Sequence, residues 1–141
     1  MKYFLTILLS SLLFAACSSS KMISMDPAQF DPCTGQSDLT TGDVFTGETV
    51  DNVVLNQQGG LVYVTMDVHT YCNAALTMEM QQKENQVTLM VSNTNTAADN
   101  SVGVIKARTA FRDLAPGTYD LKITDKTGHK LLHQESITIP E

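Results

Sequence analysis

The amino-acid sequence predicts an all-β protein, folded as an antiparallel two-sheet β-sandwich of about seven strands. Apolar and polar residues alternate with period two over residues 61–81 and 104–123, as in strands that bury one face. Turn-forming Gly, Pro, Asn and Asp residues separate the alternating runs at short intervals. Because no stretch after residue 42 has helical periodicity, we expect the sandwich domain to occupy residues 43–141.

The first 16 residues are expected to be a signal peptide and not part of the fold. Lys2 supplies a positive charge, an apolar run follows over residues 4–14, and two small residues, Ala15 and Ala16, come next. The apolar run is about half the ~20 residues that a membrane-spanning helix needs. This pattern predicts export of the remaining chain.

The stretch LFAAC, residues 13–17, resembles the lipobox of bacterial lipoproteins. The resemblance implies that the Cys17 thiol receives a diacylglycerol, that the chain is cut before it, and that acyl chains anchor the protein. Phe14 departs from the family pattern, in which Leu is commonest at this position; an ordinary secretory signal with a chance cysteine is the alternative. Ser18 after the cysteine implies the outer membrane, and the lack of an acidic run favours its periplasmic face.

Charge and aromatic content exclude some partners. The chain has 15 acidic residues against 9 Lys and Arg, a net charge of −6, which argues against nucleic acid and against anionic lipid head groups as partners. Trp is absent and aromatic residues make up 6% of the chain, which weakens any stacking platform for sugars or bases.

Two of the three cysteines remain once Cys17 is assigned to lipid. In an oxidising periplasm, Cys33 and Cys72 are expected to form a disulfide. It would close a loop of about 40 residues, stabilise the fold by roughly 4 kcal/mol, and pin residues 26–38 to the domain. Buried thiols, or a redox or metal pair, are the alternatives, but there is no CxxC spacing and no nearby His. Residues 17–42 otherwise predict a tether and an irregular segment.

The strands are expected from about residue 50 onward and are separated by turns at 57–60, 82–85 and 125–128. The long alternating run from residue 61 exceeds a usual strand, so we expect a bend or a change of sheet near residues 71–73. The polar stretch 92–101 is expected to be a long loop. The expected strands cover residues 50–56, 61–81 with that interruption, 87–91, 105–112, 119–123 and 130–139.

A motif in the penultimate expected strand sharpens the fold. The stretch LAPGTYDLKI, residues 114–123, places a Pro-Gly turn before Tyr119, whose hydroxyl is then expected to reach a nearby backbone group. This stretch resembles the penultimate strand of immunoglobulin-like sandwiches, including fibronectin type III and carboxypeptidase-regulatory-like domains. The resemblance implies the fold and says almost nothing of function.

A basic stripe is the most distinctive candidate binding feature. Lys106, Arg108 and Arg112 alternate outward in an acidic protein. They are expected either to bind an acidic partner or to pair with acidic residues on a neighbouring strand, such as Asp120.

The histidines give weaker candidates. Asp67 and His69 share an outward strand face, about 7 Å apart, but lack a third metal ligand at local spacing. His129 and His133 have a spacing that suits zinc only on a helix; on a strand they would lie roughly 13 Å apart. Neither pair predicts a metal site. Four methionines are expected to fill the core or, in part, to form a soft binding surface: Met66, Met78, Met80 and Met90.

No catalytic motif is present: the sequence has no nucleophile elbow, no phosphate-binding loop and no paired-carboxylate motif. We therefore expect a non-enzymatic, cofactor-free lipoprotein that acts by binding a protein or another envelope component, through loop 92–101 or an exposed sheet edge. The alternative is a small-ligand or glycan-binding accessory lipoprotein, with a pocket lined by Tyr63, Tyr71 and Met side chains. A hydrolase is the third and least favoured hypothesis.

Overall fold

The computed structural model describes residues 22–38, 47–95 and 101–141, and these residues form an all-β fold of ten strands. Across those ranges no helix is long and apolar enough to cross a membrane. The strands are β1 (Ser24–Met25), β2 (Gln29–Phe30), β3 (Thr34–Asp38), β4 (Thr49–Gln58), β5 (Leu61–Tyr71), β6 (Leu76–Lys83), β7 (Gln86–Asn93), β8 (Ser101–Arg112), β9 (Gly117–Asp125) and β10 (Leu131–Ile139).

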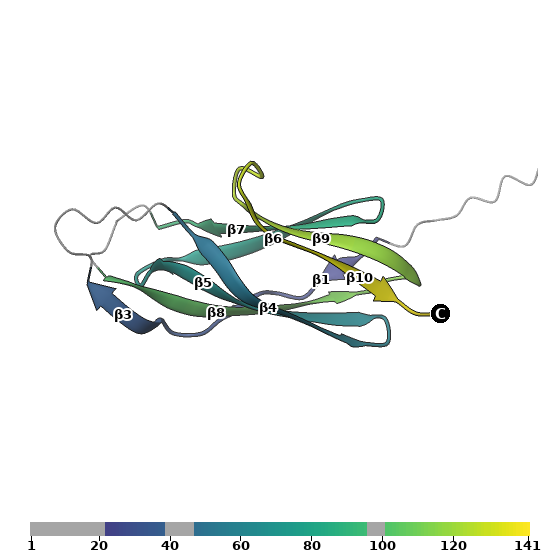
Figure 1. Cartoon of the computed structure of the whole chain (residues 1–141), viewed down its shortest axis with the longest axis horizontal. Coiled ribbons are helices and arrows are strands. Elements are labelled where there is room, and N and C mark those ends of the chain that lie inside the picture. The colour runs from purple at the N-terminus through teal and green to yellow at the C-terminus, as the bar shows by residue number, and fades with distance from the viewer. Residues whose placement is uncertain (1–21, 39–46, 96–100) are drawn as a thin grey trace, which may run out of the picture.

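The strands form two sheets that lie over one another, the arrangement of a β-sandwich (Figure 1). Sheet A has the order β1-β8-β5-β4, and the short strands β2 and β3 also pair with β8. Sheet B has the order β10-β9-β7-β6. The predicted count of about seven strands is wrong: β4 to β10 make seven strands of 8 to 12 residues, and β1 to β3 are three further, shorter ones.

The core between the sheets follows the predicted period of two. In β5 every second side chain, from Val62 to Val68, is buried, while the residues between them face outward. The predicted change of sheet near residues 71–73 is confirmed, because β5 belongs to sheet A and β6 to sheet B. The largest fully buried apolar side chains are Met66, Leu89, Leu121, Ile123, Val62, Val64, Val68, Val87 and Val91.

One strand pair departs from the predicted antiparallel arrangement. Strands β7 and β9 are parallel, with Val87 beside Leu121 and Leu89 beside Ile123. Between them the chain crosses to sheet A for β8 alone and returns, so β9 enters sheet B in the same direction as β7. Because only β8 separates β7 from β9 along the chain, β7 and β9 run in the same direction.

The N-terminal strap, residues 24–38, was predicted to be irregular and is instead part of sheet A. It runs antiparallel along the edge of β8, from Ser24 opposite Arg112 to Asp38 opposite Ser101. The strap is broken into three short strands, and prolines at 27 and 32 lie in the two breaks. Proline has no backbone N–H to donate, which explains why the ladder is interrupted and why the sequence did not indicate a strand.

The predicted disulfide is confirmed. Cys33 and Cys72 are bonded, with their Cα atoms 5.3 Å apart, which ties the end of the strap to the turn after β5. Gly103 of β8 lies beneath this bridge: a Cβ atom there would approach the Thr34 carbonyl oxygen to 2.6 Å and the Cys33 Sγ to 2.7 Å. Glycine at this position is therefore required by the close approach of the strap.

The predicted role of Tyr119 is also confirmed. Its ring is buried, and its hydroxyl donates a 3.0 Å hydrogen bond to the carbonyl oxygen of Ala115, four residues earlier. This contact fixes the turn that leads from β8 into β9.

Candidate functional site

The outer face of sheet A is the side of β4, β5 and β8 that points away from the core. On β8 it carries the predicted basic stripe, Lys106, Arg108 and Arg112, and all three residues are exposed. It also carries two exposed large apolar side chains: Tyr63 of β5 is 41% exposed and Val54 of β4 is 57% exposed. This face therefore combines charge with uncovered apolar surface.

Two residues of the stripe bind the strap. The Arg112 guanidinium donates hydrogen bonds of 2.5 Å and 2.7 Å to the Asp26 carboxylate. Arg108 holds Asp31 in the same two-pronged way, with one contact of 3.0 Å. The hydrogen bonds from Arg112 lower the pKa of the Asp26 carboxyl, and the same contact raises the pKa of Arg112.

The third basic residue pairs across the sheet. Lys106 Nζ lies 2.8 Å from Asp67 Oδ1, and Asn52 donates a 2.9 Å hydrogen bond to Asp67 Oδ2. These hydrogen bonds, the one from Lys106 first, lower the pKa of Asp67. His69, which the sequence placed beside Asp67, instead contacts Asp51 of β4 at 2.9 Å. Asp67 and His69 thus serve two separate polar contacts.

The acidic partner suggested by the sequence is wrong. Asp120 lies on β9, in sheet B, and accepts a 2.6 Å hydrogen bond from the Ser136 hydroxyl. The stripe pairs instead with acidic residues of the strap and of β5. Its positive charge is therefore compensated within the fold.

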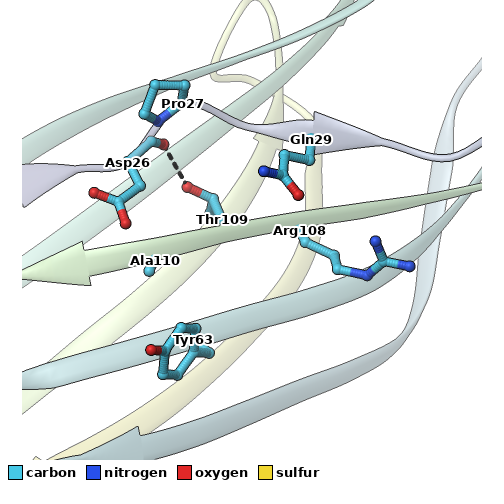
Figure 2. A pocket seen from close by; sticks show the side chains of 7 residues that line it. All are labelled: Asp26, Pro27, Gln29, Tyr63, Arg108, Thr109 and Ala110. Atoms are coloured by element: carbon cyan, nitrogen blue, oxygen red, sulfur yellow. Dashed lines mark hydrogen bonds between the residues drawn. The ribbon is translucent and has the colours of Figure 1, made fainter.

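A hollow opens in this face between the strap and β5 (Figure 2). The register places Tyr63 directly opposite Ala110, whose small side chain leaves the space beside the tyrosine ring unfilled. The cavity has a volume of about 270 Å³. Its lining residues are Asp26, Pro27, Gln29, Tyr63, Arg108, Thr109 and Ala110.

The strap forms the upper wall of the hollow. The Thr109 hydroxyl donates a 2.8 Å hydrogen bond to the Asp26 carbonyl oxygen, which fixes the strap where it leaves the β8 ladder. Figure 2 shows the Gln29 side chain extending from β2 towards β8, while the guanidinium of Arg108 points away from Ala110. The amide of Gln29 and the ring of Tyr63 therefore both line the hollow.

The outer face of sheet B is different in kind. Its hydroxyl groups satisfy one another across strands, as in the 2.7 Å contact between Thr77 and Ser92 and the 3.1 Å contact between Thr118 and Thr138. The single tyrosine in the strands of sheet B, Tyr119, is buried. Sheet A therefore offers the more chemically distinctive face.

The remaining candidates do not join this site. Cys17 and residues 96–100 of the expected loop lie outside the described residues. His129 lies exposed in the turn before β10, and His133 Nε2 lies 3.4 Å from Glu135. Within the described ranges no group of three His, Cys, Asp or Glu residues could hold a metal ion.

The residues expected to line a ligand pocket do not come together around the hollow. Tyr63 lines the hollow, but Tyr71 and the methionines do not. Met66 and Met78 are buried in the core, and Met80 packs against it, as expected for core filler, whereas Met90 is half-buried and is not part of the core cluster. Comparisons with protein-family models, with curated proteins and with solved structures found no match for this chain.

Residues of the strap are the functional candidates that the sequence did not reveal. Asp26 and Asp31 each precede a proline, and such Asp-Pro pairs are typical of turns. Apart from these Asp-Pro pairs, the sequence did not indicate which basic residue would pair with either carboxylate. Gln29 carried no signal, because its position opposite Arg108 depends on the long-range register of the strap.

Proposed function

We propose that this protein is a non-catalytic lipoprotein of the bacterial outer membrane, anchored by acyl chains on Cys17 and facing the periplasm. Its role is to bind a component of the cell envelope through the outer face of sheet A. The lipobox-like sequence supports the anchor, and the exposed Tyr63 and Val54 support the binding face. No catalytic residue, metal or cofactor enters this proposal.

The single observation that carries the binding role is the uncovered ring of Tyr63 beside a hollow in the outer face of sheet A. On sheet B, hydroxyl groups already pair with one another. On sheet A, the charges are paired but the ring of Tyr63 remains uncovered beside a hollow. Exposed apolar surface with a polar surround is typical of interaction sites.

We assign the sandwich to an immunoglobulin-like variant, supported by the hydrogen bond from Tyr119 to Ala115. The parallel pairing of β7 and β9 distinguishes it from the fully antiparallel immunoglobulin arrangement.

The hollow beside Tyr63 favours a second candidate role, that of a small-ligand or glycan-binding accessory lipoprotein.

Two experiments test the proposed function in cells. Replacing Cys17 by Ala should abolish incorporation of radiolabelled fatty acid and release the protein from membranes; labelling that persists would refute the anchor. A photo-crosslinking residue at Val54 should capture an envelope component, whereas the same residue at Thr138, on the outer face of sheet B, should not. Equal capture at both positions, or capture at neither, would refute the assignment of the face.

A further inference from the structure

The geometry points to a neutral saccharide as the ligand of the hollow beside Tyr63. We infer that one sugar ring stacks on the tyrosine and is held by the amide of Gln29. This inference rests on the proposed binding role of the outer face of sheet A and names the ligand of that face.

The charges around the hollow favour a neutral ligand. Asp26 and Arg108 line it, but each is already engaged: Asp26 with Arg112 and Arg108 with Asp31. Asp26 is ionised at neutral pH, and its hydrogen bonds with Arg112 lower its pKa further. A charged ligand would compete with groups that already hold a partner, whereas an uncharged one leaves both two-pronged ion pairs intact.

The apolar wall favours a ring with polarised C–H groups. Tyr63 is 41% exposed, and the face of an aromatic ring is the negative side of its quadrupole. The C–H groups on one face of a sugar ring carry partial positive charge and complement it. Ala110 opposite Tyr63 keeps the floor of the hollow low enough for such a ring to approach.

The polar groups favour hydroxyls. An amide has both donor and acceptor atoms, which match the dual character of a sugar hydroxyl. Gln29 supplies one amide at the strap, and Asn56 lies opposite Tyr63 on β4, on the same outer face. Asn56 is thus the direct neighbour of Tyr63 on β4, while Gln29 lies on the other side of it, across β8.

Size and area separate a sugar from a protein partner. The cavity of about 270 Å³ lies just below the ~300–1,000 Å³ of pockets that enclose a drug-sized ligand, so it takes one ring of a longer chain. A stable protein interface buries about 800 Å² on each partner. Tyr63 and Val54 are the exposed large hydrophobic residues described on this face, too few for an interface of that kind.

The test uses the full lipidated chain, purified in a detergent that has no sugar head group. It is applied to an array of immobilised neutral hexose and N-acetylhexosamine oligosaccharides, with acidic oligosaccharides on the same array. The wild-type protein should bind neutral members. Tyr63→Ala should weaken that binding about tenfold or more, and Gln29→Ala should weaken it less, while Tyr63→Phe should retain it within about threefold.

Leu131→Ala is the matched control, because Leu131 is 54% exposed and lies at the start of β10, in the other sheet. It should bind as the wild type does, and thermal unfolding should show that every variant is folded. Absence of binding to all neutral members, binding to acidic members alone, or undiminished binding by folded Tyr63→Ala would each overturn the inference. Lipid labelling at Cys17 and crosslinking at Val54 could still succeed in that case, so failure of the ligand is distinguishable from failure of the proposed function.

Discussion

Removing the bridge between Cys33 and Cys72 should destabilise the domain by about 4 kcal/mol. The two cysteines are 39 residues apart, and the loop-closure entropy of a cross-link at that separation corresponds to about 4 kcal/mol at 25 °C. Since domains of this size are stable by only about 5–15 kcal/mol, the loss is a large part of the total. The melting temperature should fall by about 10–20 °C.

The assay is urea unfolding followed by circular dichroism. The reference protein is Cys17→Ser, which removes only the cysteine outside the bridge, and the test protein also carries Cys33→Ser and Cys72→Ser. If the free energy of unfolding of the test protein is less than about 1 kcal/mol below that of the reference protein, the reasoning is refuted. Alkylation of Cys33 or Cys72 in the folded reference protein without a reductant would also refute it, because bonded sulfurs do not react.

The close approach of the strap and the bridge to Gly103 predicts that Gly103→Ala destabilises the bridged protein. The added methyl would lie 2.6 Å from the Thr34 carbonyl oxygen and 2.7 Å and 3.0 Å from the two bridge sulfurs. Overpacking of this kind costs about 1–3 kcal/mol. In the protein without the bridge the strap is free to shift, so the cost of Gly103→Ala should become smaller. Equal costs in the two proteins would show that the close approach is not enforced by the bridge.

Three smaller predictions concern a hydrogen bond, the core and pH. Tyr119→Phe should cost about 1 kcal/mol in urea unfolding, because the Ala115 carbonyl oxygen loses its partner; no change would mean that the hydroxyl contributes nothing. Met66→Ala should cost about 2–5 kcal/mol, since Met66 is fully buried; a cost under 1 kcal/mol would place it outside the core. Because the pKa of Asp26 is lowered, its contact with Arg112 should stabilise the fold above about pH 4 and be lost on further acidification. On acidification from pH 5 to below pH 4, the free energy of unfolding of Arg112→Gln should therefore fall less than that of the wild type. Equal falls would contradict the ion pair.

The sandwich strands were predictable because their signal is local. In β5 the buried residues recur at every second position, and each lies within a run that turn residues interrupt. The interruption at residues 72–75 carried its own signal, since the alternating run was too long for one strand. The bonded cysteine pair and the hydrogen bond of Tyr119 were also predictable, because each depends on a residue type with few other uses.

The strap and the parallel pair were not predictable, because both depend on pairing between distant segments. Residues 24–38 join the sheet only along β8, and the prolines at 27 and 32 conceal that pairing in the sequence. Whether β9 lies parallel to β7 depends on how many strands the chain spends in the other sheet. Neither fact is written in the composition or period of the segments themselves.

The candidate site shows the same division. The basic stripe was visible as alternation within β8, but its acidic partners come from the strap, whose register the sequence hides. The hollow exists because Ala110 faces Tyr63, a coincidence of two strands that are far apart in the chain. A small residue and a large one were both visible, and only the register brings them together.

The wall of the hollow and the proposed anchor belong to one segment, and this links binding to tethering. Fully extended, the chain from Cys17 to Asp26 spans at most about 30 Å. If Cys17 carries the acyl chains, the strap side of the hollow stays within about that distance of the bilayer. A force applied at the anchor would reach buried Ile23 and the β1 ladder first, then the pairs of Asp26 with Arg112 and Asp31 with Arg108, and only then the bridge at Cys33. Those two pairs therefore connect the wall of the hollow to the segment that leads to the proposed tether. They engage two of the three basic residues of the stripe, while Lys106 pairs with Asp67 of β5.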